Sequence, residues 1–251
     1  ERGAREVRLT AQDLAAYGRD LGENLVRLLA EMRGVKGEFR VRLGMMNPDT
    51  AASFFSDLVA LLKEEPRFYK YLHMPVQSGD NRVLRLMRRR YTVELFEKLV
   101  RELQRELPMA CLATDVIVGF PGEDEKAFEN TCRLLERVQP DKVHIARYSV
   151  RPHTLAATYP QLPEPVKKRR SQYLTELVAE LTLRRNLEFV GREEKALLVE
   201  VKGEGVVGRL VNYRPEVVGN VDAEAVLGKF ADVVIEEAAP IYLVGRAVSL
   251  H

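Results

Sequence analysis

The first 150 residues alternate short apolar strands with amphipathic helical segments, and this alternation restricts the possible fold more than any other feature of the sequence. Strands separated by helices form right-handed crossovers and hence a parallel sheet. Five strands are too few to close a barrel of eight. We therefore predict an α/β fold with an open, partial parallel β/α barrel that lacks its first strand. The expected strands are Val7–Leu9, Phe39–Leu43, Tyr69–His73, Cys111–Val118 and Val143–Tyr148.

The pattern changes after residue 160. A proline-rich segment leads into a long helical pattern, which ends at Gly191. Beyond it, short alternating strands separated by glycines are typical of a small five-stranded barrel of about sixty residues. We therefore divide the chain into a partial barrel (1–163), a linking helix (164–190) and a small all-β barrel (191–251).

The composition is that of an ordinary globular protein, with 46% hydrophobic and 30% charged residues. No apolar run approaches the length of a membrane span and no signal-peptide pattern opens the chain, so we expect a cytoplasmic location and no membrane partner. Two cysteines cannot build a disulfide framework, which agrees with a reducing compartment, and we expect Cys111 and Cys132 to lie in the core. Because Glu1 is followed almost at once by a strand, we also expect that an N-terminal segment is missing.

Charge is distributed unevenly along the chain. Residues 191–251 hold seven Lys and Arg against ten Asp and Glu, a net charge of −3, whereas residues 1–190 carry +5. A surface that binds a polyanion should therefore lie mostly on the first part. Two basic runs, Arg88–Arg90 and Lys167–Arg170, occur there, although a charge run taken alone usually forms a solvated helix face.

The most informative short segment is Thr114–Glu123 (TDVIVGFPGE), in which an apolar strand runs into a Gly-Pro-Gly loop. Ligands of α/β proteins bind beyond the carboxyl ends of the strands, and glycines let the backbone approach them closely. Thr114, Asp115 and Glu123 are therefore candidate ligand contacts. The alternative is a plain junction in which Pro121 and Gly122 shape a turn and Glu123 begins the next helix.

Several further motifs accompany this segment: His73–Asp80 (HMPVQSGD), Arg88–Thr92 (RRRYT), Tyr148–Thr154 (YSVRPHT), Leu9–Asp20 (LTAQDLAAYGRD) and Arg42–Pro48 (RLGMMNP). Together they resemble the radical-SAM methylthiotransferases, the MiaB-like group. The last two look most like the archaeal and eukaryotic branch, which acts on threonylcarbamoyl-adenosine in tRNA. Residues 192–251 are similar to the TRAM domain, an RNA-binding barrel that ends these enzymes. The resemblance covers essentially the whole chain.

The resemblance implies an enzyme that adds a methylthio group to C2 of threonylcarbamoyl-adenosine next to the anticodon. It also implies S-adenosylmethionine and two 4Fe–4S clusters as cofactors, with tRNA and an electron donor as partners. The cluster cysteines of the family lie upstream of the position that Glu1 occupies, and Cys111 and Cys132 cannot replace them. We therefore expect an inactive fragment that holds no cluster and no other metal, and we assign no catalytic residue.

The resemblance also places an S-adenosylmethionine pocket at the strand ends, where Gln, Asp and Ser side chains suit ammonium and hydroxyl groups. For Arg42 the alternative to a cofactor carboxylate or phosphate is pairing with a neighbouring acid. Tyr148 either stacks on adenine or fills the barrel, and His73 is interpreted as a packed core residue. The remaining polar residues have an alternative role in turns and helix caps. The cofactor candidates are Gln12, Asp13, Arg42, Gln77, Ser78, Asp115, Gly119, Gly122, Glu123 and Tyr148.

RNA contacts are expected from the run Arg88, Arg89 and Arg90. In the small barrel, whose net negative charge is unusual for an RNA-binding module, a local patch of Lys202, Arg209 and Arg214 is the candidate, and a pure packing role is the alternative. Two other functions remain open for the chain. One is a methylthiotransferase that acts on a ribosomal protein, and the other is a non-catalytic tRNA-binding module.

Overall fold

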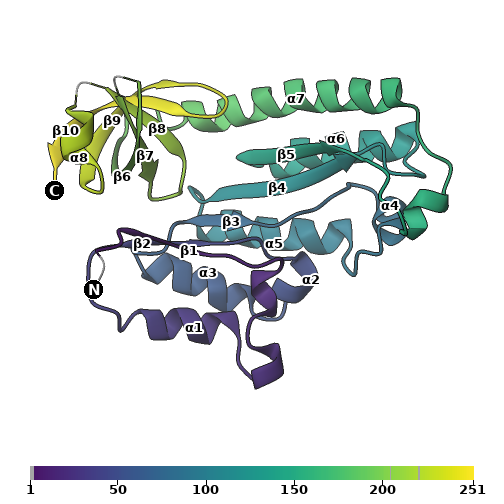
Figure 1. Cartoon of the computed structure of the whole chain (residues 1–251), viewed down its shortest axis with the longest axis horizontal. Coiled ribbons are helices and arrows are strands. Elements are labelled where there is room, and N and C mark those ends of the chain that lie inside the picture. Colours follow the sequence, from purple (N-terminus) through teal and green to yellow (C-terminus); the bar gives the residue numbers. More distant parts are fainter. Residues whose placement is uncertain (1–2, 204, 220) are drawn as a thin grey trace.

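The computed structural model describes residues 3–203, 205–219 and 221–251 and shows two β-rich parts joined by a long helix (Figure 1). The first part has five parallel strands in the order β1-β2-β3-β4-β5, with isolated bridges joining β2 to β3. The predicted partial barrel with five parallel strands is therefore confirmed. The strands are β1 (Glu6–Leu9), β2 (Arg40–Leu43), β3 (Tyr71–His73), β4 (Cys111–Val118) and β5 (Lys142–Arg147).

Helices cover one face of this sheet and leave the other face toward the barrel interior. Because alternate strand residues point to opposite faces, one set of residues on each strand packs against the helices and those between them face the interior. Leu112, Val116 and Val118 of β4 join the buried core beneath the helices, and Asp115 points to the barrel interior. Side chains of Asn24, Thr92 and Asp124 cap three of the helices. The helices are α1 (Leu25–Met32), α2 (Pro48–Ala51), α3 (Phe55–Glu64), α4 (Asn81–Leu86), α5 (Val93–Glu106) and α6 (Glu125–Val138), with short 3-10 turns η1 (Leu14–Ala16), η2 (Arg19–Leu21) and η3 (Leu155–Thr158).

The linking helix α7 (Glu164–Leu187) begins directly after Pro163 and packs against β5 and α6. Its buried Leu174 and Leu181 belong to the core of the partial barrel. In Figure 1 it runs along the sheet toward the second part. None of the helices in the described ranges is long and apolar enough to cross a membrane.

The second part is a closed five-stranded barrel in the order β10-β8-β7-β6-β9, as the spacing of its glycines predicts. Its core contains Phe189, Leu198 and Val206. The elements are β6 (Glu193–Lys202), β7 (Gly205–Leu210), β8 (Pro215–Gly219), α8 (Ala223–Val226), β9 (Phe230–Ala238) and β10 (Leu243–Leu250).

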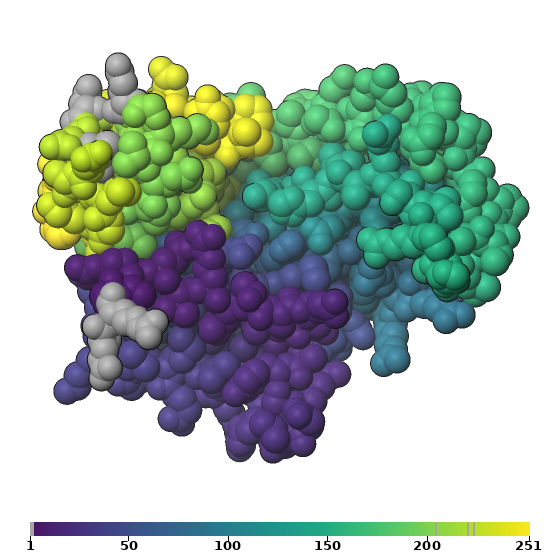
Figure 2. Space-filling view, viewed as in Figure 1, coloured from purple at the N-terminus to yellow at the C-terminus, as the bar shows by residue number. Residues whose placement is uncertain are grey.

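In Figure 2 the small barrel, coloured yellow-green to yellow, lies directly against the purple N-terminal part of the chain, and its contacts are with residues at the amino-terminal ends of the strands. The turn between β7 and β8 makes this contact: Tyr213 packs against Tyr69 and Tyr71, at ring-centroid distances of 4.8 and 5.1 Å. The guanidinium of Arg40 lies 4.6 Å from the ring centroid of Phe230. The carboxyl ends of the strands are therefore left on the opposite side.

Candidate functional site

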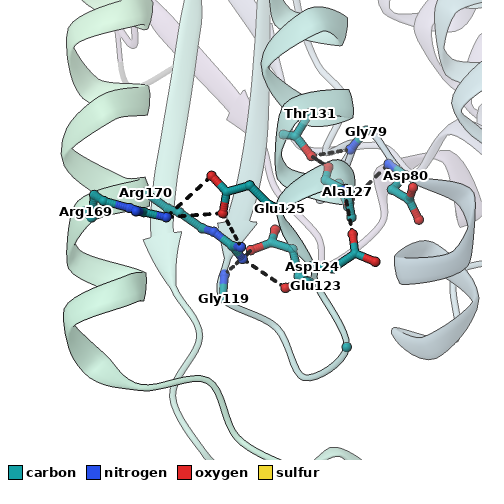
Figure 3. A network of polar contacts seen from close by, with 12 residues as sticks. Gly79, Asp80, Gly119, Glu123, Asp124, Glu125, Ala127, Thr131, Arg169 and Arg170 are labelled. Carbon is teal, nitrogen blue, oxygen red and sulfur yellow. Dashed lines mark hydrogen bonds and ion pairs between the residues drawn. The ribbon is translucent and has the colours of Figure 1, made fainter.

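The Gly-Pro-Gly loop after β4 is fixed by a buried ion pair (Figure 3). The Glu123 carboxylate is 2% exposed and accepts hydrogen bonds from the Gly119 N–H and the Arg170 guanidinium, each at 2.7 Å. Arg170 also donates to the Glu123 carbonyl and to Glu125. Burial raises the pKa of Glu123, and the Gly119 N–H and Arg170 oppose that effect. The structure therefore places Glu123 as a support of the loop, with its carboxylate occupied within the protein.

Two glycines of the loop are required by close packing against other elements. Gly119 has φ +73°, and a Cβ atom there would overlap the Lys167 side chain of α7. Gly122 has φ +91°, and its Cβ would lie 2.7 Å from Leu86 of α4. Lys167 is buried and donates to the Tyr148 carbonyl at 3.1 Å and to Glu164 at 2.9 Å. Two members of the basic run at the start of α7, Lys167 and Arg170, are therefore buried and bind other parts of the protein. The two residues between them are exposed to solvent.

Gln77, just beyond β3, has the features of a ligand-binding side chain. Its backbone is held at φ +67° by hydrogen bonds with Asp115 and Ile117 on β4, at 2.8 and 2.9 Å. A left-handed conformation is costly for glutamine and persists only where its surroundings enforce it. The side chain is 7% exposed, and its Oε1 atom has no hydrogen-bond partner among the described residues. A buried acceptor of this kind is suited to an ammonium or hydroxyl group of a ligand.

The neighbouring polar candidates have internal roles. Ser78 is fully buried and accepts a hydrogen bond from the Asp80 N–H, as a capped turn does. Asp13 caps η1 and also accepts from the Asn47 N–H at 3.0 Å, so it ties the end of β1 to the end of β2. Gln12 beside it is exposed at the same edge of the sheet.

Tyr148 follows β5 and lies against the Gly-Pro-Gly loop. Its ring meets Phe120 edge to face at 5.0 Å, and the Lys167 ammonium lies 5.7 Å from the ring centroid. Its buried hydroxyl has no partner within the part of the chain that the structure describes. Gln77 and Tyr148 therefore each place a polar atom at the carboxyl ends of the strands without an internal use for it.

The barrel interior holds a histidine pair and a carboxylate. His73 Nε2 lies 2.8 Å from Asp115 Oδ1, and the rings of His73 and His144 are 5.5 Å apart between centroids. Burial, followed by the nearby Lys142 charge, lowers the pKa of His144. His73 therefore faces the interior and binds Asp115, whereas sequence reasoning treated it as a packed core residue. His144 was missed, although it alternates with Val143 and Ile145 of the core face.

Arg42 lies deeper in the barrel, beside the residues of the small barrel. Its guanidinium is 5.0 Å from the Tyr71 ring centroid and 5.1 Å from that of Tyr213, and Arg209 lies 5.1 Å from the same Tyr213 ring. Arg42, a predicted cofactor contact, therefore lies close to Arg209, a predicted RNA contact. Arg42 lies beside Tyr71 at the start of β3, whereas Gln77 follows the end of that strand.

A cleft of about 750 Å³ opens at this place, between the partial barrel, α7 and the small barrel. Its cationic lining consists of Arg8, Arg42, Lys142, Arg209 and Arg214. Arg214 is 4% exposed at its side chain and bonds to Asp141 and Asn186. Within residues 3–203, 205–219 and 221–251, the Nη1 atom of Arg214 and the Nε atoms of Arg42 and Arg209 have no acceptor. The cleft therefore offers buried guanidinium donors to an anion.

The other predicted RNA contacts, Arg88–Arg90 and Lys202, lie outside this cleft. Arg88, Arg89 and Arg90 form the turn between α4 and α5, where Arg88 has φ +57° and is exposed, as is Arg90. Lys202 is exposed at the end of β6. The described residues that line the cleft include none of these four.

Comparisons with known proteins agree with this architecture. The family profile of the radical SAM superfamily matches residues 1–135. A probable threonylcarbamoyladenosine tRNA methylthiotransferase of Pyrococcus horikoshii is 42% identical over 99% of this chain, and one of Archaeoglobus fulgidus is 40% identical over 97%. The chain spans 58% and 57% of the lengths of these relatives. The radical SAM enzyme coproporphyrinogen III oxidase (HemN) of Escherichia coli shares the fold with a TM-score of 0.53, at 18% identity, over 92% of this chain and 54% of that one.

Proposed function

The chain belongs to the radical SAM superfamily, and we propose that it forms the cofactor-binding and RNA-binding part of a tRNA methylthiotransferase. The substrate is threonylcarbamoyl-adenosine next to the anticodon, which receives a methylthio group at C2. The observation that carries this proposal is the 40–42% identity to archaeal relatives of that name, which extends over nearly the whole chain, including the small barrel. Partners of the whole protein are tRNA and an electron donor.

S-adenosylmethionine fits the carboxyl ends of the strands, because polar atoms there have no internal use. Gln77 Oε1 would accept a hydrogen bond from the ammonium or a ribose hydroxyl, and Gln12 is exposed at the same edge. Tyr148 would bind through its hydroxyl or by stacking, and the loop from Gly119 to Gly122 would form one wall. Asp115 reaches this pocket from the interior side. The bound cofactor would supply the radical and the methyl group.

The iron–sulfur clusters of such an enzyme do not fit this chain. A 4Fe–4S cluster takes three or four thiolates, and the chain holds two cysteines, on β4 and α6. Burial raises the pKa of the Cys111 thiol to about 12 and that of Cys132 to about 11, so neither supplies a thiolate. The proposed role of this chain therefore includes no reaction step at a cluster. The cluster ligands would come from a part of the enzyme that corresponds to the portion of the relatives not matched by this chain.

RNA is proposed to bind at the cleft between the two barrels, where the small barrel acts as a TRAM-like module. Arg42, Arg209 and Arg214 would contact phosphate oxygens through the donors that lack acceptors in the described residues. This location would allow a barrel with net charge −3 to bind RNA, because its Arg209 and Arg214 lie in the cleft beside Arg8, Arg42 and Lys142 of the partial barrel. Lys202 and the turn at Arg88–Arg90 would add peripheral contacts.

The substrate assignment is tested by a nucleoside digest of tRNA from cells that lack the gene. We expect the methylthio derivative of threonylcarbamoyl-adenosine to disappear and to return when the gene is restored. If this nucleoside persists and a ribosomal protein instead loses a methylthio group, the second methylthiotransferase function is correct. Normal levels of both would favour the non-catalytic tRNA-binding module.

The pocket is tested with the Gln77→Asn variant of the full-length, cluster-loaded enzyme. Asparagine tolerates a positive φ, so this change retracts the amide with little effect on the backbone. Loss of a hydrogen bond to a charged group costs about 1.5–3 kcal/mol, or about tenfold or more in affinity for S-adenosylmethionine. Isothermal titration calorimetry measures it, and Gln172→Asn, on the exposed face of α7, is the control. Equal affinities of the two variants would remove Gln77 from the pocket.

A further inference from the structure

We propose that His73, Asp115 and His144 form a mononuclear binding site for a divalent transition metal such as Zn²⁺ inside the partial barrel. One ligand atom of each residue lies within 4.8 Å of those of the other two. The sequence alone predicts no such site, because the three residues are far apart in it. His73 and Asp115 are separated by 42 positions, and the helix α6 lies between Asp115 and His144. The site shares Asp115 with the proposed S-adenosylmethionine pocket, but metal binding by the three residues does not depend on the proposed tRNA activity.

The backbone brings the three side chains together by strand register. His73, Asp115 and His144 lie on three adjacent parallel strands, β3, β4 and β5. Asp115 pairs with His144 across β4 and β5, and His73 pairs with Ala113, two residues before Asp115 on the same face. Sites that are built on strands are held more precisely than sites on loops.

The ligand set is one that transition metals use. Two imidazoles with a carboxylate and open positions occur in catalytic zinc sites and in non-haem iron sites. Tetrahedral ligands at about 2.0–2.1 Å from Zn²⁺ lie roughly 3.4 Å from each other. His73 and Asp115 are already 2.8 Å apart, so binding replaces their hydrogen bond by coordination. The His144 ring nitrogen already lies within 4.8 Å of both of their ligand atoms, and it must move closer to them to complete the set.

The cluster is also accessible to an ion from solution. The side chains of His73 and Asp115 are 14% and 23% exposed, and His144 is exposed. Arg42 and Lys142 face the same interior and act on His144 electrostatically. Their positive charge disfavours a bare cation and favours one that carries an anionic fourth ligand, such as hydroxide or chloride. The open coordination position would be filled in that way.

A matched control exists on the surface of the same chain. His251 Nε2 lies 2.6 Å from Asp232 Oδ2, which repeats the histidine–carboxylate pair of the barrel. The third residue beside this pair is Ser249, whose Oγ lies 3.0 Å from His251 Nε2, whereas the third residue in the barrel is a second histidine. If a histidine–carboxylate pair alone were sufficient, both places would bind metal equally.

The experiment uses the tag-free chain, stripped with EDTA and titrated with Co²⁺, followed by competition with Zn²⁺. We expect one equivalent of Co²⁺ to produce visible d–d absorption that Zn²⁺ abolishes. His144→Ala, which changes an exposed side chain, and Asp115→Asn should each weaken binding at least tenfold, whereas His251→Ala should leave it unchanged. Far-UV circular dichroism checks that each variant is folded. Absence of the absorption, or equal binding by the wild type and His144→Ala, would overturn the proposal and leave His73 and Asp115 as a hydrogen-bonded pair.

Discussion

Glu216 in the small barrel should make the stability of this protein fall as the pH rises. Its side chain is fully buried on β8, and neither carboxylate oxygen has a hydrogen-bond partner in the described chain. It is packed against the backbone of β10 so closely that a Cβ atom at Gly245 would overlap its carboxylate. Burial, with a smaller contribution from the Glu194 charge, raises the pKa of Glu216 to about 8.

The sign and size of the effect follow from this raised pKa. Below pH 4.5 the carboxyl is protonated both in the folded and in the unfolded chain, so its titration does not change the free energy of unfolding there. Between pH 4.5 and about 8 only the unfolded chain releases the proton, so the free energy of unfolding falls. At about 1.4 kcal/mol per pH unit, the loss is about 3 kcal/mol at pH 7 and approaches about 5 kcal/mol above pH 8.

Glu216→Gln removes this titration and keeps the shape of the side chain. Urea unfolding, followed by far-UV circular dichroism at pH 5, 6, 7 and 8, gives the free energy of unfolding of the variant and of the wild type. The difference between them should shift in favour of the variant by about 3–4 kcal/mol from pH 5 to pH 8. Glu237→Gln, on the exposed part of β9, should give a constant difference. A constant difference for Glu216→Gln as well would refute the reasoning.

Three further predictions concern the loop and the cleft. Arg170→Met should leave the Glu123 carboxylate buried without its partner and lower the free energy of unfolding by about 3 kcal/mol or more, and adding Glu123→Gln should recover much of that loss in the same urea assay. Gly119→Ala should lower the melting temperature measured by circular dichroism, because φ +73° and the Lys167 side chain both oppose a Cβ atom, whereas Gly191→Ala meets no neighbouring atom and should lose less. Arg209→Ala should weaken tRNA binding in a filter-binding assay and reduce its salt slope by about one, whereas Lys229→Ala, on the exposed surface of the small barrel, should leave the slope unchanged; equal slopes would place the RNA elsewhere.

Apolar periodicity was enough to predict the strands and the longer helices of this fold, but not the short helices α2 and α8 or the 3-10 turns. The strand Cys111–Val118 has the bounds expected from its apolar run, and the small barrel has the five strands that its glycines separate. Such patterns are local, because a strand or helix is selected by residues close to one another in the sequence. The radical SAM family was also identified correctly from short motifs, since these retain residue types around the strand ends.

The partners of the polar residues could not be predicted in this way. Glu123 and Arg170 are 47 positions apart, and a basic run looks the same whether two of its members are buried or all of them face solvent. Arg42 was predicted to meet a cofactor carboxylate, a phosphate or a neighbouring acid, whereas its neighbours Tyr71 and Tyr213 come from two different parts of the fold. These contacts depend on packing between segments that are far apart in the sequence, and the pattern of a single sequence does not show which of those segments meet.

The helix α7 acts as a spacer of fixed length between the Gly-Pro-Gly loop and the small barrel. Near its start, Arg170 holds the Gly-Pro-Gly loop, and near its end Asn186 donates to the carbonyls of Ala239 and Pro240 in the small barrel. A helix rises about 1.5 Å and turns about 100° per residue. Inserting or deleting one residue between these anchors would swing the small barrel around the helix axis. The number of residues in α7 therefore sets both the distance and the relative rotation between the Gly-Pro-Gly loop and the small barrel.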